Sequence, residues 1–150
     1  MDALELLKND HDKVSELFKK VKATESEAAH HQIFEKIKEE LETHTHIEET
    51  IFYPTIMVNE EIKDIVLEGI QEHKQAKTLL REIPNLADGS EVFEAKFKVL
   101  MEDIEHHVEE EEDDMFKKVR KAFDSKQLEE LGAQMEAEKQ KFQKSYKASA

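Results

Sequence analysis

Two copies of the motif His-x-x-x-Glu-Glu contain residues that can bind a metal ion. His44 and Glu48 belong to the first copy, and His107 and Glu111 belong to the second. A spacing of four residues on an α-helix places both side chains on one face, about 6 Å apart along the axis, so both can reach one ion. The chain has no cysteine, and imidazoles with carboxylates suit iron, manganese or zinc. The motifs therefore predict a metal site.

These residues interrupt rows of apolar residues that recur at helical spacing, and two further rows each contain one inward histidine, His11 and His73. A buried polar group without a partner costs about 1 to 3 kcal/mol. Polar residues in the middle of four apolar rows would therefore be unfavourable unless they shared a ligand. The predicted metal ligands are His11, His44, Glu48, His73, His107 and Glu111.

The chain contains an internal duplication. His11 precedes His44 by 33 residues, and His73 precedes His107 by 34. Two carboxylates that can bridge suggest a pair of ions rather than one. By the symmetry of the repeat, we expect His11 and His44 to bind one ion and His73 and His107 the other, with one bridging glutamate from each half.

The remaining histidines, His30, His31, His46 and His106, fall on other helical faces and are expected at the surface. The run from Glu109 to Asp114 is interpreted as a solvated helix face, apart from the predicted ligand within it. Glu49 and Glu112, which follow the proposed ligands, are likewise expected to be solvated charges. The alternative is that they accept hydrogen bonds from ligand imidazoles.

The elements that must position these residues are long helices. The chain has 39% charged and 38% hydrophobic residues, three glycines and two prolines, which favours amphipathic helices over a sheet. Pro54 should bend the second helix near residues 50–53, and residues 85–90 form a loop. The predicted helices are 2–22, 26–58, 59–83, 91–123 and 124–146. We expect an all-α protein with an up-down-up-down four-helix bundle over residues 1–123. The C-terminal helix within 124–150 should pack on the bundle or on a partner.

Composition also argues against several functions. A formal net charge of −14 disfavours nucleic acids and anionic membrane surfaces. The N-terminus lacks the pattern of a signal peptide, and no stretch resembles a membrane span. A cytoplasmic location is therefore expected. The ferritin-like arrangement needs Glu-x-x-His on two helices. Glu27-x-x-His30 is the only match and lies near a helix start, so the sequence does not fit that arrangement.

The sequence resembles the hemerythrin-like family, in particular the bacterial branch called the HHE cation-binding domain. The resemblance covers about residues 2–122. The matching segments are Asp10-His11, His44-x-x-x-Glu48-Glu49 with Phe52-Tyr53-Pro54, Glu72-His73, and His107-x-x-x-Glu111-Glu112 with Met115-Phe116. The resemblance implies a non-haem di-iron centre, bridged by carboxylates and by an oxo or hydroxo group, that meets dioxygen or a related small molecule.

Two departures from the animal oxygen carriers alter that expectation. Those proteins have a histidine at the position of Lys77, and five residues rather than four separate their last histidine from a carboxylate. The resemblance therefore implies a His4Glu2 centre with open positions. Such a centre suits turnover with ferrous iron, peroxide or nitric oxide better than reversible oxygen carriage. We expect Lys77 to extend into solvent.

Several functions remain open at this point. The first is binding or sensing of dioxygen or of reactive oxygen or nitrogen species. The second is a di-iron oxidoreductase acting as a ferroxidase or in peroxide or nitric oxide detoxification, so the sequence leaves open whether the protein is an enzyme. The third is an iron-responsive module whose C-terminal helix meets a protein partner or a second copy. A purely structural helical protein would instead be indifferent to chelators.

Overall fold

The computed structural model describes residues 1–87 and 90–149, and this part of the chain is helical without a β-strand. The α-helices are α1 (Ala3–Lys22), α2 (Glu27–Ile47), α3 (Tyr53–Ile56), α4 (Glu60–Glu82), α5 (Glu91–Glu110), α6 (Phe116–Ala122) and α7 (Ser125–Ser149). Short helices of other types are η1 (Glu48–Phe52), η2 (Ile83–Asn85) and η3 (Glu111–Met115). The loop predicted at residues 85–90 includes 88–89, which lie outside the described residues. Among the described helices, none combines the length and apolar character needed to cross a bilayer.

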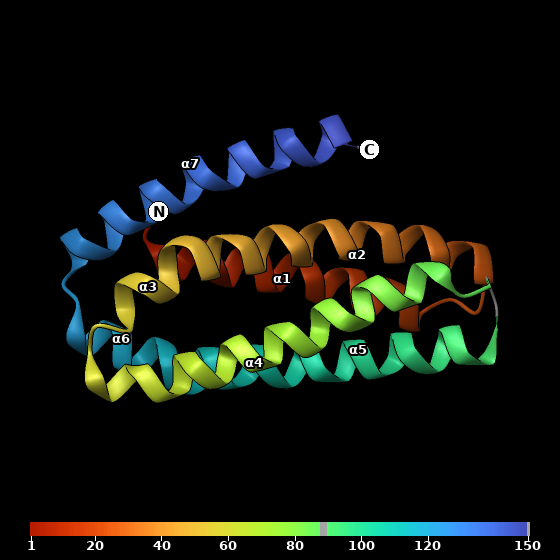
Figure 1. Ribbon diagram of the computed structural model, residues 1–150, viewed down its shortest axis with the longest axis horizontal. Helices are drawn as coiled ribbons and strands as arrows, with labels where there is room; N and C mark the ends of the chain where they lie inside the picture. The colour runs from red at the N-terminus through yellow and green to blue at the C-terminus, as the bar shows by residue number, and fades with distance from the viewer. Residues whose placement is uncertain (88–89, 150) are drawn as a thin grey trace.

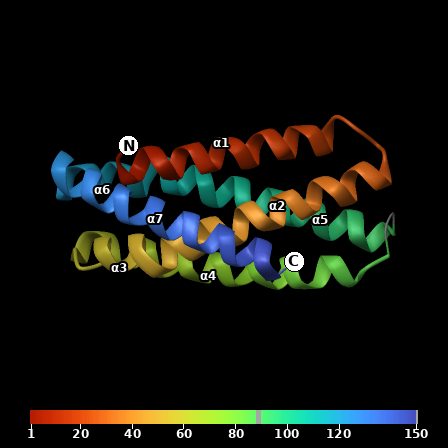
Figure 2. The ribbon, with the colours of Figure 1, turned by 90° about the horizontal axis from the view of Figure 1, so that it is seen from above.

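The helices form an up-down-up-down bundle, which confirms the predicted fold class. In Figure 1, α1 and α2 form one antiparallel pair, and α4 and α5 form the other. Helix α2 continues through η1 into α3, and α5 continues through η3 into α6. Helix α7 lies outside this bundle and crosses α1 and α2 (Figure 2).

Polar side chains at the predicted positions start the helices. Asp2 caps α1, Ser26 caps α2 and Asn59 caps α4, at the residues where the predicted helices begin, and Ser90 caps α5. Each side chain accepts a hydrogen bond from a backbone N–H in the first turn that otherwise has no helical partner. These local signals explain why the helix starts were predictable.

A π-helical turn begins at the first glutamate of each copy of the His-x-x-x-Glu-Glu motif. The N–H of Tyr53 donates to the carbonyl of Glu48, five residues earlier, and the N–H of Phe116 does the same to Glu111. Pro54 lies just after the first π turn, near the predicted bend. The second π turn has no proline, so proline alone does not cause this feature. Such turns often occur at functional sites, and here each begins at a predicted bridging glutamate.

The apolar core is divided into two clusters by a layer of polar residues. Leu7 and Ile47 belong to one cluster, and Val14 and Leu41 belong to the other. His11 lies between Leu7 and Val14 along α1. The two clusters therefore leave a buried polar layer across the middle of the bundle, where the predicted ligands meet.

Helix α7 packs on the bundle through Leu128, Leu131 and Met135, which are buried. Gly132 is also buried, and a Cβ atom there would lie 2.4 Å from the carbonyl oxygen of Met1. The absence of a side chain at this position thus permits close contact between α7 and the start of the chain.

His30 was expected at the surface, and this prediction is wrong. Its Nε2 lies 3.0 Å from the carbonyl oxygen of Val21 and 2.6 Å from that of Thr24, and its Nδ1 lies 2.9 Å from Oε1 of Glu94. Carbonyl and carboxylate oxygens accept hydrogen bonds, so a protonated imidazole can donate on both sides. His30 therefore joins the α1–α2 connection to α5.

A His30→Ala variant should lose stability in a pH-dependent way. Burial lowers the pKa of His30, but Glu94 and the backbone carbonyls outweigh burial and raise it. A raised folded-state pKa means that the stabilisation is fully present below the unfolded value of about 6.5 and is lost as the pH rises through the folded value. Thermal melts should therefore show a larger difference between wild type and variant at pH 5.5 than at pH 9. An equal difference at both values would contradict a role for the charged ring.

Candidate metal centre

The structure brings all of the predicted ligands into the polar layer. His11 comes from α1, His44 from α2, His73 from α4 and His107 from α5, while Glu48 and Glu111 begin η1 and η3. All of these side chains are buried. The two four-residue steps, from histidine to glutamate, place each pair on one side of its helix, as the spacing predicted.

Glu111 lies between the two halves of the layer. Its Oε1 is 3.2 Å from Nε2 of His11, and its Oε2 is 3.1 Å from Nε2 of His107. One carboxylate oxygen of Glu111 thus faces each half.

Glu48 makes the corresponding contacts from the opposite motif. Its Oε1 is 3.0 Å from Nε2 of His44 and 3.2 Å from Nε2 of His73. Each glutamate therefore contacts one histidine of the first half and one of the second.

The ligand atoms fall into two overlapping groups, within each of which all the atoms lie within 4.8 Å of one another. The groups are His11, His44 and Glu111, and Glu48, His73, His107 and Glu111. This division matches the pairing of histidines expected from the internal duplication, with Glu111 common to both groups.

Several buried atoms of the layer make no hydrogen bond with the residues that the structure describes, although some of them lie 3.0 to 3.2 Å apart. They are Nε2 of His11, His44 and His107, both carboxylate oxygens of Glu48, and Oε1 of Glu111. Leaving such groups unpaired is costly. A metal cation bound to these nitrogen and oxygen atoms would remove that cost, so the residues present fit a metal centre.

A carboxylate outside the layer holds the outer nitrogen of each ligand histidine. The Nδ1 pairs are His11 with Glu112 at 2.7 Å, His44 with Asp10 at 3.0 Å, His73 with Glu49 at 2.8 Å and His107 with Glu72 at 2.6 Å. Because a carboxylate accepts, Nδ1 donates, and Nε2, the nitrogen that would bind a metal ion, then faces inward. Such partners orient metal-binding imidazoles and make them better ligands.

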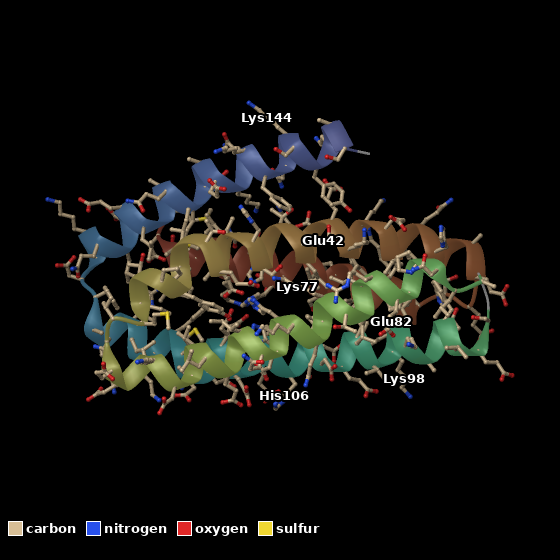
Figure 3. All side chains as sticks on the ribbon, viewed as in Figure 1. Glu42, Lys77, Glu82, Lys98, His106 and Lys144 are labelled. Carbon is tan, nitrogen blue, oxygen red and sulfur yellow. The ribbon has the colours of Figure 1, made fainter. Side chains whose placement is uncertain are left out.

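The expectation that Glu49 and Glu112 are solvated charges is therefore wrong. Both accept from ligand histidines, which come from other helices, so no spacing within one helix reveals the pairing. Lys77 does not simply extend into solvent either, because its Nζ donates to Oε1 of Glu49 at 2.8 Å. Figure 3 shows Lys77 on the side of α4 that faces α2.

Carboxylates retain protons on the imidazoles when no metal is bound. Burial lowers the pKa of His44, but Glu48 and Asp10 outweigh burial and raise it to about 10. Burial likewise lowers the pKa of His107, but the nearby carboxylates outweigh burial and raise it to about 11, with the largest contribution from Glu111. A metal ion must displace these protons, so metal binding releases protons.

Tyr53 belongs to the centre although sequence analysis gave it no role. Its hydroxyl donates to Oε2 of Glu111 at 2.7 Å and lies 3.4 Å from Nε2 of His73. Burial, with the nearby glutamates, raises the pKa of Tyr53 well above its usual value, so the hydroxyl stays protonated. In the second repeat the same position is Phe116, which stacks on His11 as Tyr53 stacks on His73. The repeated aromatic was the available signal, and the hydroxyl makes the two halves different.

A small cavity adjoins the ligand histidines. Its volume is about 20 Å³, enough for a molecule the size of water. Apolar side chains form the rest of the wall, together with Asp10 and Thr45. The apolar residues are Val14, Leu41, Ile104 and Val108.

His106 and His46 also lie outside the layer. His106 is exposed, as predicted, with 65% of its side chain accessible, and Figure 3 shows it on the outer face of the bundle. It forms a surface group with Glu72 and Glu110. His46 instead lies between α2 and α7, with its Nε2 2.9 Å from Oε1 of Glu138.

The chain is similar in sequence and in fold to known proteins. The family model for the Hemerythrin HHE cation binding domain matches residues 2–119. A crystal structure of a hemerythrin HHE cation binding domain-containing protein from Mycobacterium kansasii is 26% identical, with a TM-score of 0.81, and the match covers 97% of this chain and 89% of that chain. A DNA nickase from Nostoc sp. is 26% identical over 143 residues, which are 95% of this chain but 40% of that protein. The chain thus spans less than half the length of this curated relative.

Proposed function

Because the chain belongs to the Hemerythrin HHE cation binding domain family, we propose that it is a non-haem di-iron protein that binds dioxygen or a related small molecule. The observation that carries this proposal is the placement of Glu48 and Glu111, each within 3.2 Å of one histidine from each half. Two carboxylates shared by two pairs of imidazoles suit two neighbouring cations better than one.

The histidines and the carboxylates of this chain have different proposed roles. The histidines of each half would hold one ion through Nε2, while the carboxylates hydrogen-bonded to Nδ1 keep each ring in its orientation. Nitrogen and oxygen donors without thiolate suit iron, manganese or zinc, and we propose iron among these because the family resemblance implies it. Bound ferrous iron would supply the electrons for a reaction with dioxygen, peroxide or nitric oxide.

The cavity beside the histidines supports a small apolar or weakly polar ligand. About 20 Å³ excludes organic substrates, whose pockets are typically about 300 Å³ or larger. Val14, Leu41, Ile104 and Val108 give the cavity an apolar wall, which favours a small uncharged molecule.

A di-iron oxidoreductase acting on ferrous iron, peroxide or nitric oxide is the second candidate. The Tyr53 hydroxyl favours it, because a buried hydrogen-bond donor beside Glu111 can stabilise negative charge that develops there during turnover. The DNA nickase resemblance does not lead us to propose DNA cleavage. That relative is much longer than this chain, and a formal net charge of −14 opposes DNA binding.

Anaerobic loading with ferrous iron tests the proposal. Wild-type protein should bind about two irons per chain, and mixing with oxygen should produce near-ultraviolet absorption typical of an oxo-bridged ferric pair. His107→Ala should lose iron and melt at a lower temperature, because one ion loses a ligand and Glu111 loses its partner. His106→Ala, a change at the adjacent exposed position, should retain both irons.

The outcome also separates the two candidates. If one equivalent of oxygen changes the spectrum and the changed spectrum persists, the result supports binding or sensing. If the protein consumes oxygen, peroxide or nitric oxide repeatedly, the result supports an oxidoreductase. One iron or fewer in the wild type, or equal iron loss in both variants, would contradict the di-iron proposal.

A further inference from the structure

Lys139 is a buried cation on α7, beyond the region that matches the family model. The family match ends at residue 119, whereas Lys139 lies in the middle of Ser125–Ser149. Only 11% of its side chain is exposed. A lysine is rarely buried to this extent unless it is paired, so its partner identifies what the burial achieves.

The partner of Lys139 is the carboxylate that holds a metal-binding histidine. Nζ donates to Oδ1 of Asp10 at 2.6 Å, and Oδ2 of Asp10 accepts from Nδ1 of His44 at 3.0 Å. The three side chains come from α7, α1 and α2. They form a continuous path from the helix that crosses the bundle in Figure 2 to the first half of the centre.

The second half has a similar path that is open to water. Lys77 donates to Glu49, which accepts from His73. Lys77 and Glu49 are 37% and 29% exposed, whereas Asp10 is 3% exposed. Water can solvate Glu49 if Lys77 is removed, but it cannot readily reach Asp10. The charge of Asp10 therefore depends on Lys139 much more than that of Glu49 depends on Lys77.

We propose that Lys139 is a positioning residue that fixes Asp10, and through it His44, and so links the docking of α7 to metal binding in the His11–His44 half. The inference rests on the proposed two-ion centre. If Lys139 is absent or α7 moves away, Asp10 loses a partner and no longer holds the His44 ring. Linkage is reciprocal, so metal binding in this half must in turn stabilise the docked position of α7.

A metal titration with matched variants tests this link. Wild type, Lys139→Met and Lys77→Met are titrated anaerobically with ferrous iron against a chromophoric chelator. Loss of an outer partner of a metal ligand typically weakens binding about 10- to 100-fold. Because Lys139 contacts such a partner, Asp10, rather than the ligand itself, we expect Lys139→Met to weaken the binding of one of the two ions by about 10-fold, the lower end of that range, and to leave the binding of the other unchanged. Lys77→Met should stay within about 3-fold of the wild type, as expected for an exposed ion pair. Lys139→Arg, which keeps the charge, should recover most of the affinity.

Hydrogen exchange of α7 gives a readout that a merely structural lysine would not change. In the wild type, ferrous iron should slow amide exchange in α7. In Lys139→Met this metal dependence should disappear while the total helix content, measured by circular dichroism, stays unchanged. Unchanged affinities in Lys139→Met would overturn the inference. The inference would also be overturned if Lys139→Met weakened the binding of both ions equally, or if neither Lys139→Met nor Lys139→Arg folded. Lys139 would then act on the bundle as a whole. Fewer than two ions in the wild type would instead overturn the proposed function.

Discussion

A Glu111→Gln variant is expected to lose both metal ions. Glutamine keeps the size of the side chain but cannot bridge two cations as a carboxylate does. Glu111 faces His11 with one oxygen and His107 with the other, so both halves lose a ligand. Removal of one partner from a buried ionic cluster costs about 3 to 5 kcal/mol. In the presence of iron, the melting temperature should therefore fall by roughly 10 °C.

The neighbouring glutamates serve as matched controls for Glu111→Gln. Glu110 lies at the surface beside His106, and Glu110→Gln should retain both irons. Glu112 holds the outer nitrogen of His11, so Glu112→Gln should weaken iron binding in one half, by about 10- to 100-fold. Metal analysis with thermal melts distinguishes these results. Retention of two irons by Glu111→Gln would show that this carboxylate does not bridge.

Gly132→Ala should destabilise the protein, although helix propensity alone predicts the opposite. Alanine is favoured over glycine in a helix by up to about 1 kcal/mol. A Cβ atom here, however, would lie 2.4 Å from Met1 O, 2.8 Å from Asp2 C and 2.9 Å from Ala3 N. These are backbone atoms, so α7 must move as a unit. Overpacking typically costs about 1 to 3 kcal/mol, which corresponds to a fall in melting temperature of about 2 to 10 °C.

The exposed neighbour Ala133 provides a control that separates helix propensity from the close contact at Gly132. Ala133→Gly measures the propensity contribution on the same helix without touching the N-terminus, and should cost at most about 1 kcal/mol. Denaturant unfolding of both variants, with hydrogen exchange of α7, tests the expectation. A Gly132→Ala protein that is more stable than the wild type would contradict the close contact with Met1.

Much of the fold was predictable because its signals are local. Asp2, Ser26 and Asn59 begin helices by hydrogen bonding within their own first turns. The rows of apolar residues repeat within single helices, so the bundle followed from their number and from the short connections. The π turns did not follow, since Pro54 marks one of them and the other has no such marker.

The meeting of the six candidate ligands in one layer was predictable for a related reason. Each glutamate and its histidine lie four residues apart, and the interval between histidines repeats along the chain. His11 and His73 were found only because they interrupt apolar rows at corresponding places in the two repeats. All six residues meet in one buried layer, where their ligand atoms lie close together.

The sequence by itself determined the helices, the inward side chains of the layer and the pairing of its two halves, because all of these depend on spacing within a helix or between repeats. The tertiary structure alone decided which charged residues support the layer. Glu49 and Glu112 have the same local pattern as solvated glutamates, and Lys139 looks like any polar residue of α7. Each acquires its role from a partner on another helix, and the geometry of helix packing, not the order of residues, brings those partners together.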